Sequence, residues 1–598
     1  MKIKYKLSSI IEYKLIRKVI KLISFLKPST KKNLKLIIFV MLLNSYAEFI
    51  TISSLIPLID IAYNPNNLSR LSFLNLVFDY LNIQENYQFI AISILFIIII
   101  TLSTFFKIFA LRLINGYIAT LTKELGQKLY RGVLYQDYSF HIKTNSSKLL
   151  NSLTHELDVS VSVVANILNT ILTLLSIFGI FISLSIINFK LVVYIGLIFT
   201  VFYSFITITT NKFADIYGKL LLEKRIKETK IIQESLGFIR QILLDNSQEV
   251  IVKEYHKNKS KVAQVISELT IIQQIPRYLL ESIILLVIAI TLIIMVSNQI
   301  DLGNYISLFG AFLLGIQKLI PLFQKTFVQV FQINSDKYSL NSVISYLNYI
   351  EKLEINNKAN SRKVFHLKEK IIFDNVSFSY KENIILQNIN CQIRKGEHVG
   401  IVGKTGAGKT TFIDLLMGFI KPKEGNIFID DKKMNPKLFE EFRLSISNVP
   451  QDYYLLDRSI EENIVFGNNQ NKIDYKLLNN VINSAMLRGY VNTLKLGLKT
   501  FVGEDGIKLS GGQKQRVSIA RALYKKHTFL LLDEATSSID SGMEKKIINN
   551  IIKNYPDITI IMIAHRLETL KKCDYILEIK DKKLIKHNNI KDYKSSLI

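Results

Sequence analysis

The feature that most constrains this chain is a run without any charged residue, from Val159 to Phe189. An α-helix rises 1.5 Å per residue, so about 20 apolar residues cross a hydrocarbon core of about 30 Å. The run is therefore long enough to span a membrane. Five further apolar stretches accompany it: roughly Leu36–Ile61, Gln88–Phe106, Leu191–Asn211, Ser282–Ile300 and Leu302–Ile320. We predict six membrane helices, because the cores of soluble proteins seldom contain several nearly uncharged stretches of this length.

Basic residues are distributed unevenly around these stretches. The first 33 residues contain ten Lys or Arg, and residues 111–160 and 212–277 contain many more. The intervening loops contain no basic residue beyond Arg70 and Lys190. The positive-inside rule therefore places the N-terminus, both long loops and the C-terminal part in the cytoplasm, with the chain in the inner membrane. The two long loops have helical periodicity and are predicted to extend the membrane helices.

The formal net charge of +27 at pH 7 is compatible with a nucleic-acid partner, but we predict none. Lys, Ile and Asn are abundant throughout, and such a bias raises the charge without any polyanionic partner. In residues 14–27, Lys and Arg alternate with Leu, Ile and Val. This pattern fits a helix lying on anionic lipid headgroups or, equally, an ordinary solvated helix face.

A glycine-rich segment, Gly403-Lys-Thr-Gly-Ala-Gly-Lys-Thr410, follows an apolar stretch in the C-terminal part. It fits the pattern G-x-x-x-x-G-K-[ST], in which glycines free backbone N–H groups to surround phosphate oxygens. Lys409 is expected to meet the outer phosphates, and Thr410 to ligate magnesium. Taken alone, the motif indicates a phosphate-loop NTPase.

The segment Leu509-Ser-Gly-Gly-Gln513 lies about a hundred residues further on and is the most specific motif in the chain. It resembles the signature of the ABC ATPases, in which the N-terminus of a helix faces an anion. Other family motifs lie before and after the signature, in the order typical of the family. Before it, Tyr380 resembles the aromatic residue that stacks on adenine, and Gln451 resembles the Q-loop glutamine. After it, Asp533-Glu534 ends a short apolar strand and resembles the Walker B pair, Ser537–Asp540 resembles the D-loop, and His565 resembles the switch histidine.

Each of these residues has an ordinary structural interpretation when taken alone, but their common order from Tyr380 to His565 favours function. The resemblance assigns catalysis to Glu534 and His565, with ATP as substrate, and magnesium ligation to Thr410, Gln451 and Asp533. It assigns nucleotide contacts to Tyr380, Gly403, Lys404, Thr405, Gly406, Ala407, Gly408, Lys409, Thr410, Thr411, Gln451, Leu509, Ser510, Gly511, Gly512, Gln513 and Asp540. Two segments depart from the family: the D-loop has Ser538 and Ile539 where Ala and Leu are common, and Asp505 stands before the signature where exporters usually have Arg.

The expected fold is an all-α transmembrane domain of six helices followed by an α/β phosphate-loop ATPase domain. We place a basic amphipathic segment at residues 1–33, the transmembrane domain at 34–350, a linker at 351–365 and the nucleotide-binding domain at 366–598. This plan resembles the half-transporters among ABC exporters. It implies a dimer of identical chains, in which the signature of one copy completes the ATP site of the other.

Several segments resemble the bacterial flippases that move lipid-linked oligosaccharides for protein glycosylation. They are Ala47-Glu48, Leu55–Pro57, Gln233–Asp245, Pro276–Glu281 and the outer-loop residues Phe73–Leu81. An anionic lipid headgroup would need cations near the membrane, and Lys318, Lys107 and Arg277 are the candidates. Alternatively, these residues reach the headgroups of the inner leaflet or pair with Glu48, Asp60 or Glu281.

The sequence therefore predicts an ATP-driven exporter or flippase that moves a lipid-linked saccharide or similar amphiphile outward across the inner membrane. An exporter of a peptide or of another lipid is the alternative within the same class. A soluble ABC ATPase acting on nucleic acid is the alternative from another class, and six membrane helices disfavour it.

Overall fold

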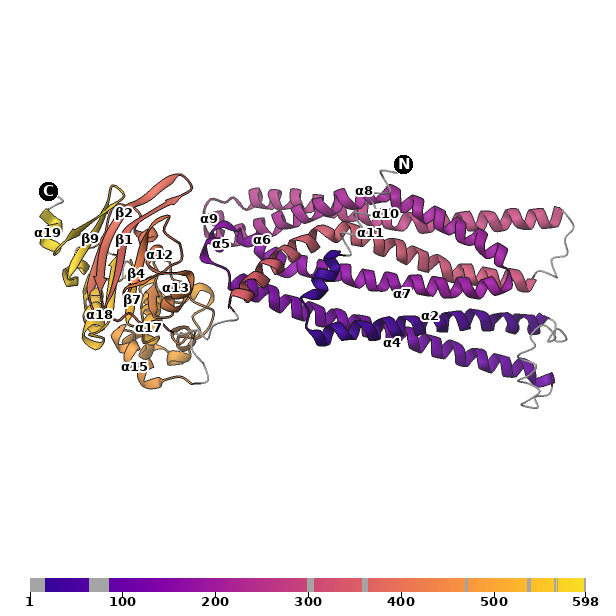
Figure 1. The fold of residues 1–598 in the computed structure, drawn as a ribbon, viewed down its shortest axis with the longest axis horizontal. Helices are drawn as coiled ribbons and strands as arrows, with labels where there is room; N and C mark the ends of the chain where they lie inside the picture. Colours follow the sequence, from indigo (N-terminus) through magenta and orange to yellow (C-terminus); the bar gives the residue numbers. More distant parts are fainter. Residues whose placement is uncertain are drawn as a thin grey trace. The chain divides into compact units, whose positions relative to one another are not determined.

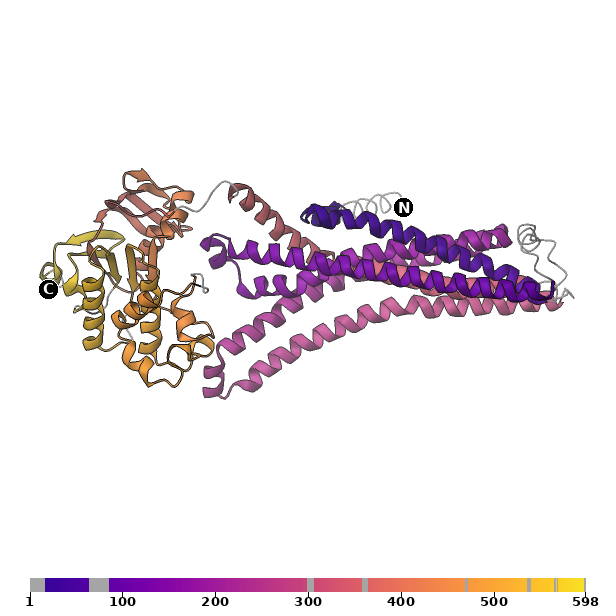
Figure 2. The ribbon, with the colours of Figure 1, turned by 90° about the horizontal axis from the view of Figure 1, so that it is seen from below.

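The computed structural model describes residues 17–63, 85–297, 306–357, 364–467, 472–534, 539–563, 566 and 568–595. The chain forms two compact units. The first unit contains residues 1–136 and 140–358, and the second contains residues 137–139 and 359–598. Figures 1 and 2 show the first unit as a set of long helices and the second as β-sheets covered by helices.

Long helices joined by short ones build the first unit. They are α2 (Pro28–Tyr63), α4 (Glu85–Leu134), α5 (Tyr138–Lys143), α6 (Ser146–Asn151), the π-turn η2 (Ser152–Glu156), α7 (Leu157–Ile187), α8 (Phe189–Gly237), α9 (Ile239–Leu244), α10 (Gln248–Ser297) and α11 (Ile306–Asn357). Helices α4 and α10 have 50 residues each. At 1.5 Å per residue each is roughly 75 Å long, which exceeds the thickness of a bilayer core.

Five helices within the described residues are long and apolar enough to cross a membrane: Pro28–Leu55, Phe89–Leu134, Ser146–Ile186, Phe189–Gly237 and Gln248–Thr291. The predicted span Leu302–Ile320 begins outside the described residues and continues in α11. Helix α4 exposes a row of large apolar side chains that includes Ile94, Ile97 and Ile98, as a lipid-facing helix does. The predicted all-α region with six long helices is confirmed.

The N-terminal helical residues 17–24 differ from one expectation of the sequence. Val19 and Leu22 are buried in a core with α2, α4, α7 and α11. Their apolar face therefore packs against protein rather than lying on lipid headgroups, because the bundle offers an apolar surface. The outer-loop residues Phe73–Leu81 lie outside the described residues.

Two β-sheets organise the second unit. Strands β2 (Asn383–Arg394), β1 (Lys370–Tyr380), β4 (Glu424–Ile429) and β5 (Lys432–Lys433) form an antiparallel sheet in that order. The larger sheet has the order β10 (Lys583–His587), β9 (Tyr575–Lys580), β3 (His398–Val402), β8 (Thr559–Ile563), β7 (Phe529–Asp533) and β6 (Ile446–Val449). All neighbouring pairs in the larger sheet are parallel except β10 with β9. Strands β7 and β8 are apolar throughout their buried residues, as expected of central parallel strands.

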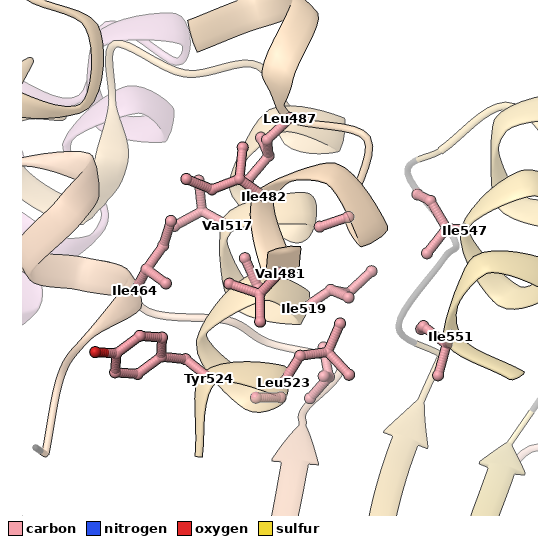
Figure 3. Packing of buried hydrophobic residues seen from close by; sticks show 14 of the residues in the cluster. Ile464, Val481, Ile482, Leu487, Val517, Ile519, Leu523, Tyr524, Ile547 and Ile551 are labelled. Carbon is pink, nitrogen blue, oxygen red and sulfur yellow. The ribbon is translucent and has the colours of Figure 1, made fainter. Parts of the chain in front are cut away.

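Helices cover these sheets and enclose two apolar cores. They are α12 (Lys409–Leu416), α13 (Pro436–Arg443), α14 (Ile460–Ile464), α15 (Tyr475–Ser484), α16 (Arg488–Thr493), α17 (Gly511–Tyr524), α18 (Ser541–Asn554) and α19 (Ile590–Ser595), with short 3₁₀ turns at Gly497–Lys499, Glu504–Gly506 and Thr569–Lys572. In one core, Val517, Ile519 and Leu523 of α17 pack in the same cluster as residues of α14, α15 and α18 (Figure 3). This packing anchors the C-terminal part of α17, where its buried residues lie.

The sequence predicts a linker at residues 351–365, between the transmembrane and nucleotide-binding domains. Helix α11 continues to Asn357, and strand β1 begins at Lys370. The α/β character predicted for the C-terminal part is confirmed.

Candidate functional site

The glycine-rich loop lies between strand β3 and helix α12. Gly403 and Gly408 have φ angles of 154° and 105°. A Cβ atom at Gly403 would lie 2.7 Å from the carbonyl oxygen of Ile579, and one at Gly408 would lie 3.0 Å from the side chain of Ile385. Both positions therefore require glycine. Gly408 is also the N-cap of α12, so the positive end of the helix dipole faces the loop.

The side chain of Lys409 folds back over this loop. Its ammonium group donates hydrogen bonds to the carbonyl oxygens of Gly403, at 2.8 Å, and Lys404, at 3.4 Å. The chain thus places a positive charge inside a loop of backbone N–H groups. This arrangement is suited to the phosphate oxygens of a nucleotide.

Two neighbouring carboxylates follow strand β7. Asp533 is its last residue, and the parallel pairing with β8 brings Asp533 opposite Ile563. Burial raises the pKa of the Asp533 carboxyl, the adjacent Glu534 raises it further, and Lys409 acts in the opposite direction. Negative charge is therefore concentrated here, close to the lysine of the phosphate loop.

Glu534 is held by both its backbone and its side chain. Its φ of 49° lies in the left-handed region, which is uncommon for residues other than glycine. Its N–H donates to the carbonyl oxygen of Ile563 at 3.2 Å, and its carbonyl oxygen accepts from Gln515 at 3.2 Å. Its carboxylate accepts a hydrogen bond of 2.9 Å from the Gln451 side chain. These contacts fix the direction of the carboxylate.

The predicted magnesium ligands Thr410, Gln451 and Asp533 supply a hydroxyl, an amide and a carboxylate. Oxygen donors of these kinds suit Mg²⁺, which binds through one or two carboxylates plus substrate phosphates. Burial first and the neighbouring Glu534 second raise the pKa of Asp533, and a divalent cation would relieve both by neutralising the carboxylate charge. The residues present therefore fit magnesium.

The signature residues begin helix α17. Ser510 is the N-cap, and a reciprocal capping box joins it to Gln513, with the Ser510 N–H donating to Gln513 Oε1 at 2.8 Å. Tyr453 donates from its hydroxyl to the carbonyl oxygen of Gly511 at 3.1 Å. Across the described part of the chain, no hydrogen bond or ion pair joins Ser510–Gln513 to Gly403–Thr410.

The remaining predicted residues lie in different settings. Asp540 caps helix α18, where its Oδ1 accepts from the N–H of Met543 at 2.8 Å. Tyr380 ends strand β1, and its side chain is about half exposed, as a residue that stacks on a base would be. His565 and the D-loop residues Ser537 and Ser538 lie outside the described residues. Asp505 has a φ of 47° in a 3₁₀ turn before the signature.

Sequence reasoning missed two residues beside the carboxylates. Gln515 is completely buried on α17 and donates to the carbonyl oxygen of Glu534. Asp414, on α12, has a pKa raised to about 6, chiefly by burial and further by Asp533. Their helical periodicity resembles that of ordinary amphipathic helices, so no sequence signal separates these positions from packing residues.

The three membrane cations are all paired with carboxylates. Lys107 Nζ lies 3.1 Å from Glu48 Oε1, and Lys318 Nζ lies 3.3 Å from Glu48 Oε2. Arg277 Nε lies 2.8 Å from Oε1 of Glu281, one turn along α10. The structure thus brings Lys107 and Lys318 together and leaves Arg277 in a local pair.

A cavity of about 630 Å³ surrounds the first two lysines. Its polar lining includes Glu48, Lys107 and Lys318, and its apolar lining includes Leu55 and Ile100. The cavity in the first unit is therefore lined partly by charged side chains and partly by apolar side chains.

Together, the second unit has the loop, carboxylates and helix N-terminus of an ATP-binding cassette, and the first has the helices of a multi-pass membrane protein. Two family descriptions match in the same order. The ABC transporter transmembrane region matches residues 36–317, and the ABC transporter family matches residues 386–537. The chain belongs to the ABC transporters and has one transmembrane region followed by one ATPase region, the arrangement found in exporter half-transporters.

Relatives and a solved structure resemble the chain over different lengths. An ATP-dependent lipid A-core flippase of Pectobacterium atrosepticum is 35% identical over 230 residues, covering 38% of this chain and 39% of that protein. The lacticin-481/lactococcin-DR transport/processing ATP-binding protein of Lactococcus lactis subsp. lactis is 28% identical over 476 residues, covering 78% of this chain and 66% of that protein. The chain thus spans less than two thirds of the length of these relatives.

The structure of a bacterial Atm1-family ABC exporter with ATP bound has a TM-score of 0.73 and 20% sequence identity. The match covers 95% of this chain and 96% of that chain. This similarity shows that the fold of both units is that of an ABC exporter.

Proposed function

We propose that the chain acts as an ATP-driven exporter that moves an amphiphile, most specifically a lipid-linked saccharide, outward across the inner membrane. The observation that carries this proposal is the cavity of about 630 Å³ in the membrane unit, where Lys107, Lys318 and Glu48 lie beside an apolar wall. An amphiphile has the matching division into a charged head and a hydrocarbon tail. The ATPase unit in the same chain supplies the energy.

We assign the roles at the ATP site from the positions of the described residues, and the role of His565 from its sequence motif alone. Lys409 and the loop N–H groups bind the phosphates, and Tyr380 stacks on the adenine. Glu534, oriented by Gln451, acts as general base toward the attacking water, assisted by His565. Magnesium, held by Thr410, Gln451 and Asp533, would neutralise charge on the phosphates when bound.

A second copy of the chain completes each ATP site in this proposal. The N-terminus of α17, with Ser510 as its N-cap, makes no hydrogen bond to the phosphate loop of its own chain within the described residues. Its first N–H groups are thus suited to the phosphates bound by a partner chain. ATP would close the two copies head to tail, and hydrolysis would reset them.

Two features support a lipid-like cargo over a peptide. Part of the cavity wall is hydrocarbon, formed by residues such as Ile52, Leu55 and Ile100. A relative that matches 38% of this chain is named a lipid A-core flippase. The Lactococcus relative, named for lacticin-481 and lactococcin-DR transport, keeps a peptide cargo as the second candidate. The match to an ABC transporter transmembrane region disfavours a soluble ATPase acting on nucleic acid.

The test is transport by the full chain in proteoliposomes. A fluorescent polyprenyl-diphosphate oligosaccharide is placed in both leaflets, and the fraction protected from an external quencher is followed after ATP addition. We expect ATP-dependent flipping by the wild type and none by Glu534→Gln. If the wild type flips no such lipid but exports a peptide, the lipid assignment is wrong and the peptide candidate replaces it.

A further inference from the structure

One carboxylate joins two lysines from distant helices inside the membrane cavity. Glu48 belongs to α2, Lys107 to α4 and Lys318 to α11. Each oxygen of Glu48 has its own ammonium partner, at 3.1 Å and 3.3 Å. The cluster therefore links three helices through a single side chain.

The three members of this cluster differ in their exposure. The side chain of Glu48 is 8% exposed, whereas those of Lys107 and Lys318 are 54% and 45% exposed. A buried carboxylate is costly unless it is paired, so Glu48 depends on the lysines. The lysines are open to the cavity and depend less on Glu48. Each ammonium group has three donors, so a further acceptor can be bound.

The cluster has more positive than negative charge. A third lysine, Lys325, lies two helical turns after Lys318 on α11. Two ammonium groups contact the one carboxylate of the cluster. Pro321 also lies in α11 and lines the cavity. Because proline has no backbone N–H, it does not form the usual helical hydrogen bond to the carbonyl oxygen of Gln317. That carbonyl oxygen is a further polar group at the cavity.

The rest of the lining is suited to acyl or prenyl chains. Each of four helices contributes apolar residues to it, such as Ile52, Phe96, Ile180 and Leu314. Burying hydrocarbon against such a wall is favourable at roughly 25 cal/mol per Å². A ligand with an anionic head and an apolar tail would satisfy both parts of the cavity.

We propose that Glu48 is an internal counter-ion that stands in for the phosphate group of the cargo, and that a phosphate-bearing lipid binds by displacing it from Lys107 and Lys318. This inference rests on the proposed export of an amphiphile and specifies its headgroup. The lysines bind phosphate as point charges, without the planar fork of arginine.

Glu48 then sets the specificity of the site. A phosphate monoester carries more negative charge than a carboxylate and replaces it at the lysines. A lipid with a neutral head cannot compensate the loss of the two ion pairs. Glu48 therefore excludes neutral lipids that fit the apolar wall equally well.

The test measures binding directly and needs no ATP. The chain contains no tryptophan, so Phe96→Trp places a single fluorescent reporter in the cavity lining. The full-length reporter protein, in an uncharged detergent, is titrated with dioctanoyl phosphatidic acid, dioctanoylglycerol and inorganic phosphate. We expect saturable binding of phosphatidic acid that is at least about 100-fold tighter than that of the other two probes.

Variants separate the counter-ion from a structural role. In the reporter background, Lys107→Met and Lys318→Met should each weaken phosphatidic acid binding by roughly 10- to 100-fold, and Lys→Arg at either position should restore most of it. Glu48→Gln should tighten the binding of phosphatidic acid and of dioctanoylglycerol by about ten-fold each, because neither lipid then has to displace a carboxylate. Lys219→Met removes a cation from an exposed pair on α8 and should change nothing.

The proposal is overturned if Glu48→Gln weakens binding while the protein keeps its wild-type melting temperature, or if both lysine variants bind phosphatidic acid normally. Equal affinity for inorganic phosphate and phosphatidic acid overturns the lipid part and identifies a soluble anion as ligand. Failure of the proposed function appears separately, as tight lipid binding without ATP-dependent flipping. Conversely, normal flipping of a phosphate lipid by the Lys107→Met, Lys318→Met double variant rejects this inference and retains the transporter.

Discussion

The side-chain amide of Gln451 donates a hydrogen bond of 2.9 Å to a carboxylate oxygen of Glu534. The two residues are 83 positions apart, and they meet because β6 and β7 are parallel neighbours and Gln451 and Glu534 follow their ends. This hydrogen bond orients the carboxylate of Glu534, the proposed general base. Hydrogen bonds to Ile563 and Gln515 hold the same residue from its backbone.

Glu534→Gln should bind ATP with near-normal affinity and lose most of its turnover. A positioned general base contributes about 10²- to 10⁴-fold to the rate, and an amide cannot accept the proton. Nucleotide affinity and steady-state hydrolysis in nanodiscs check this expectation. Glu568→Gln alters an exposed carboxylate paired with Lys571 and is the control. Near-normal turnover in Glu534→Gln would remove Glu534 from the catalytic role.

Gln515→Leu should reduce hydrolysis more than ATP affinity, because the amide holds the backbone of Glu534 rather than the nucleotide. Loss of one buried hydrogen bond also lowers the free energy of unfolding by about 1 kcal/mol. Measuring kcat, nucleotide Kd and melting temperature separates the effects, with the exposed Gln241→Leu as control. An unchanged kcat with a lowered melting temperature would limit Gln515 to a packing role.

A mixture of Lys409→Ala and Ser510→Arg chains should regain activity that neither variant has alone. A mixed dimer keeps one intact pairing of phosphate loop and signature. Purified mixed dimers then have at most about half of wild-type activity if the sites act independently. Differently tagged chains, purified through both tags, provide the measurement. Full activity of either variant alone would contradict the shared site.

Asp414→Asn should raise the melting temperature of the nucleotide-free protein at pH 8. The folded-state pKa of Asp414 is about 6, above the ordinary 3.8, because burial and Asp533 disfavour the ionised form. The wild type therefore gains stability as the pH falls from about 7 to about 4, since the folded chain takes up the proton first. The advantage of Asp414→Asn should shrink over that range and vanish near pH 4.

Calorimetry in detergent at several pH values follows this difference. The exposed Asp557→Asn is the matched control and should show no such trend. An advantage of Asp414→Asn that grows on acidification would have the opposite sign and would contradict the raised pKa.

Local patterns predicted the fold well. Charge-free runs such as Val159–Phe189 predict membrane helices, because each spanning helix must by itself be apolar and long enough to cross the bilayer. Gly403–Thr410 similarly specifies its loop, since positive φ angles need glycine. The N-terminal segment was less predictable: the amphipathic pattern around Val19 reveals an apolar face, but not whether lipid or protein covers it.

By itself, the sequence determined the order of six membrane helices and an ATPase domain, and the residue types that phosphate and magnesium require. Those properties depend on neighbours along the chain. The tertiary structure alone decided that Lys318 meets Glu48, 270 positions away, and that Gln515 supports Glu534. Such pairings arise from how helices and strands pack in space, and the energy of a buried charge depends on which partner that packing brings within hydrogen-bond distance.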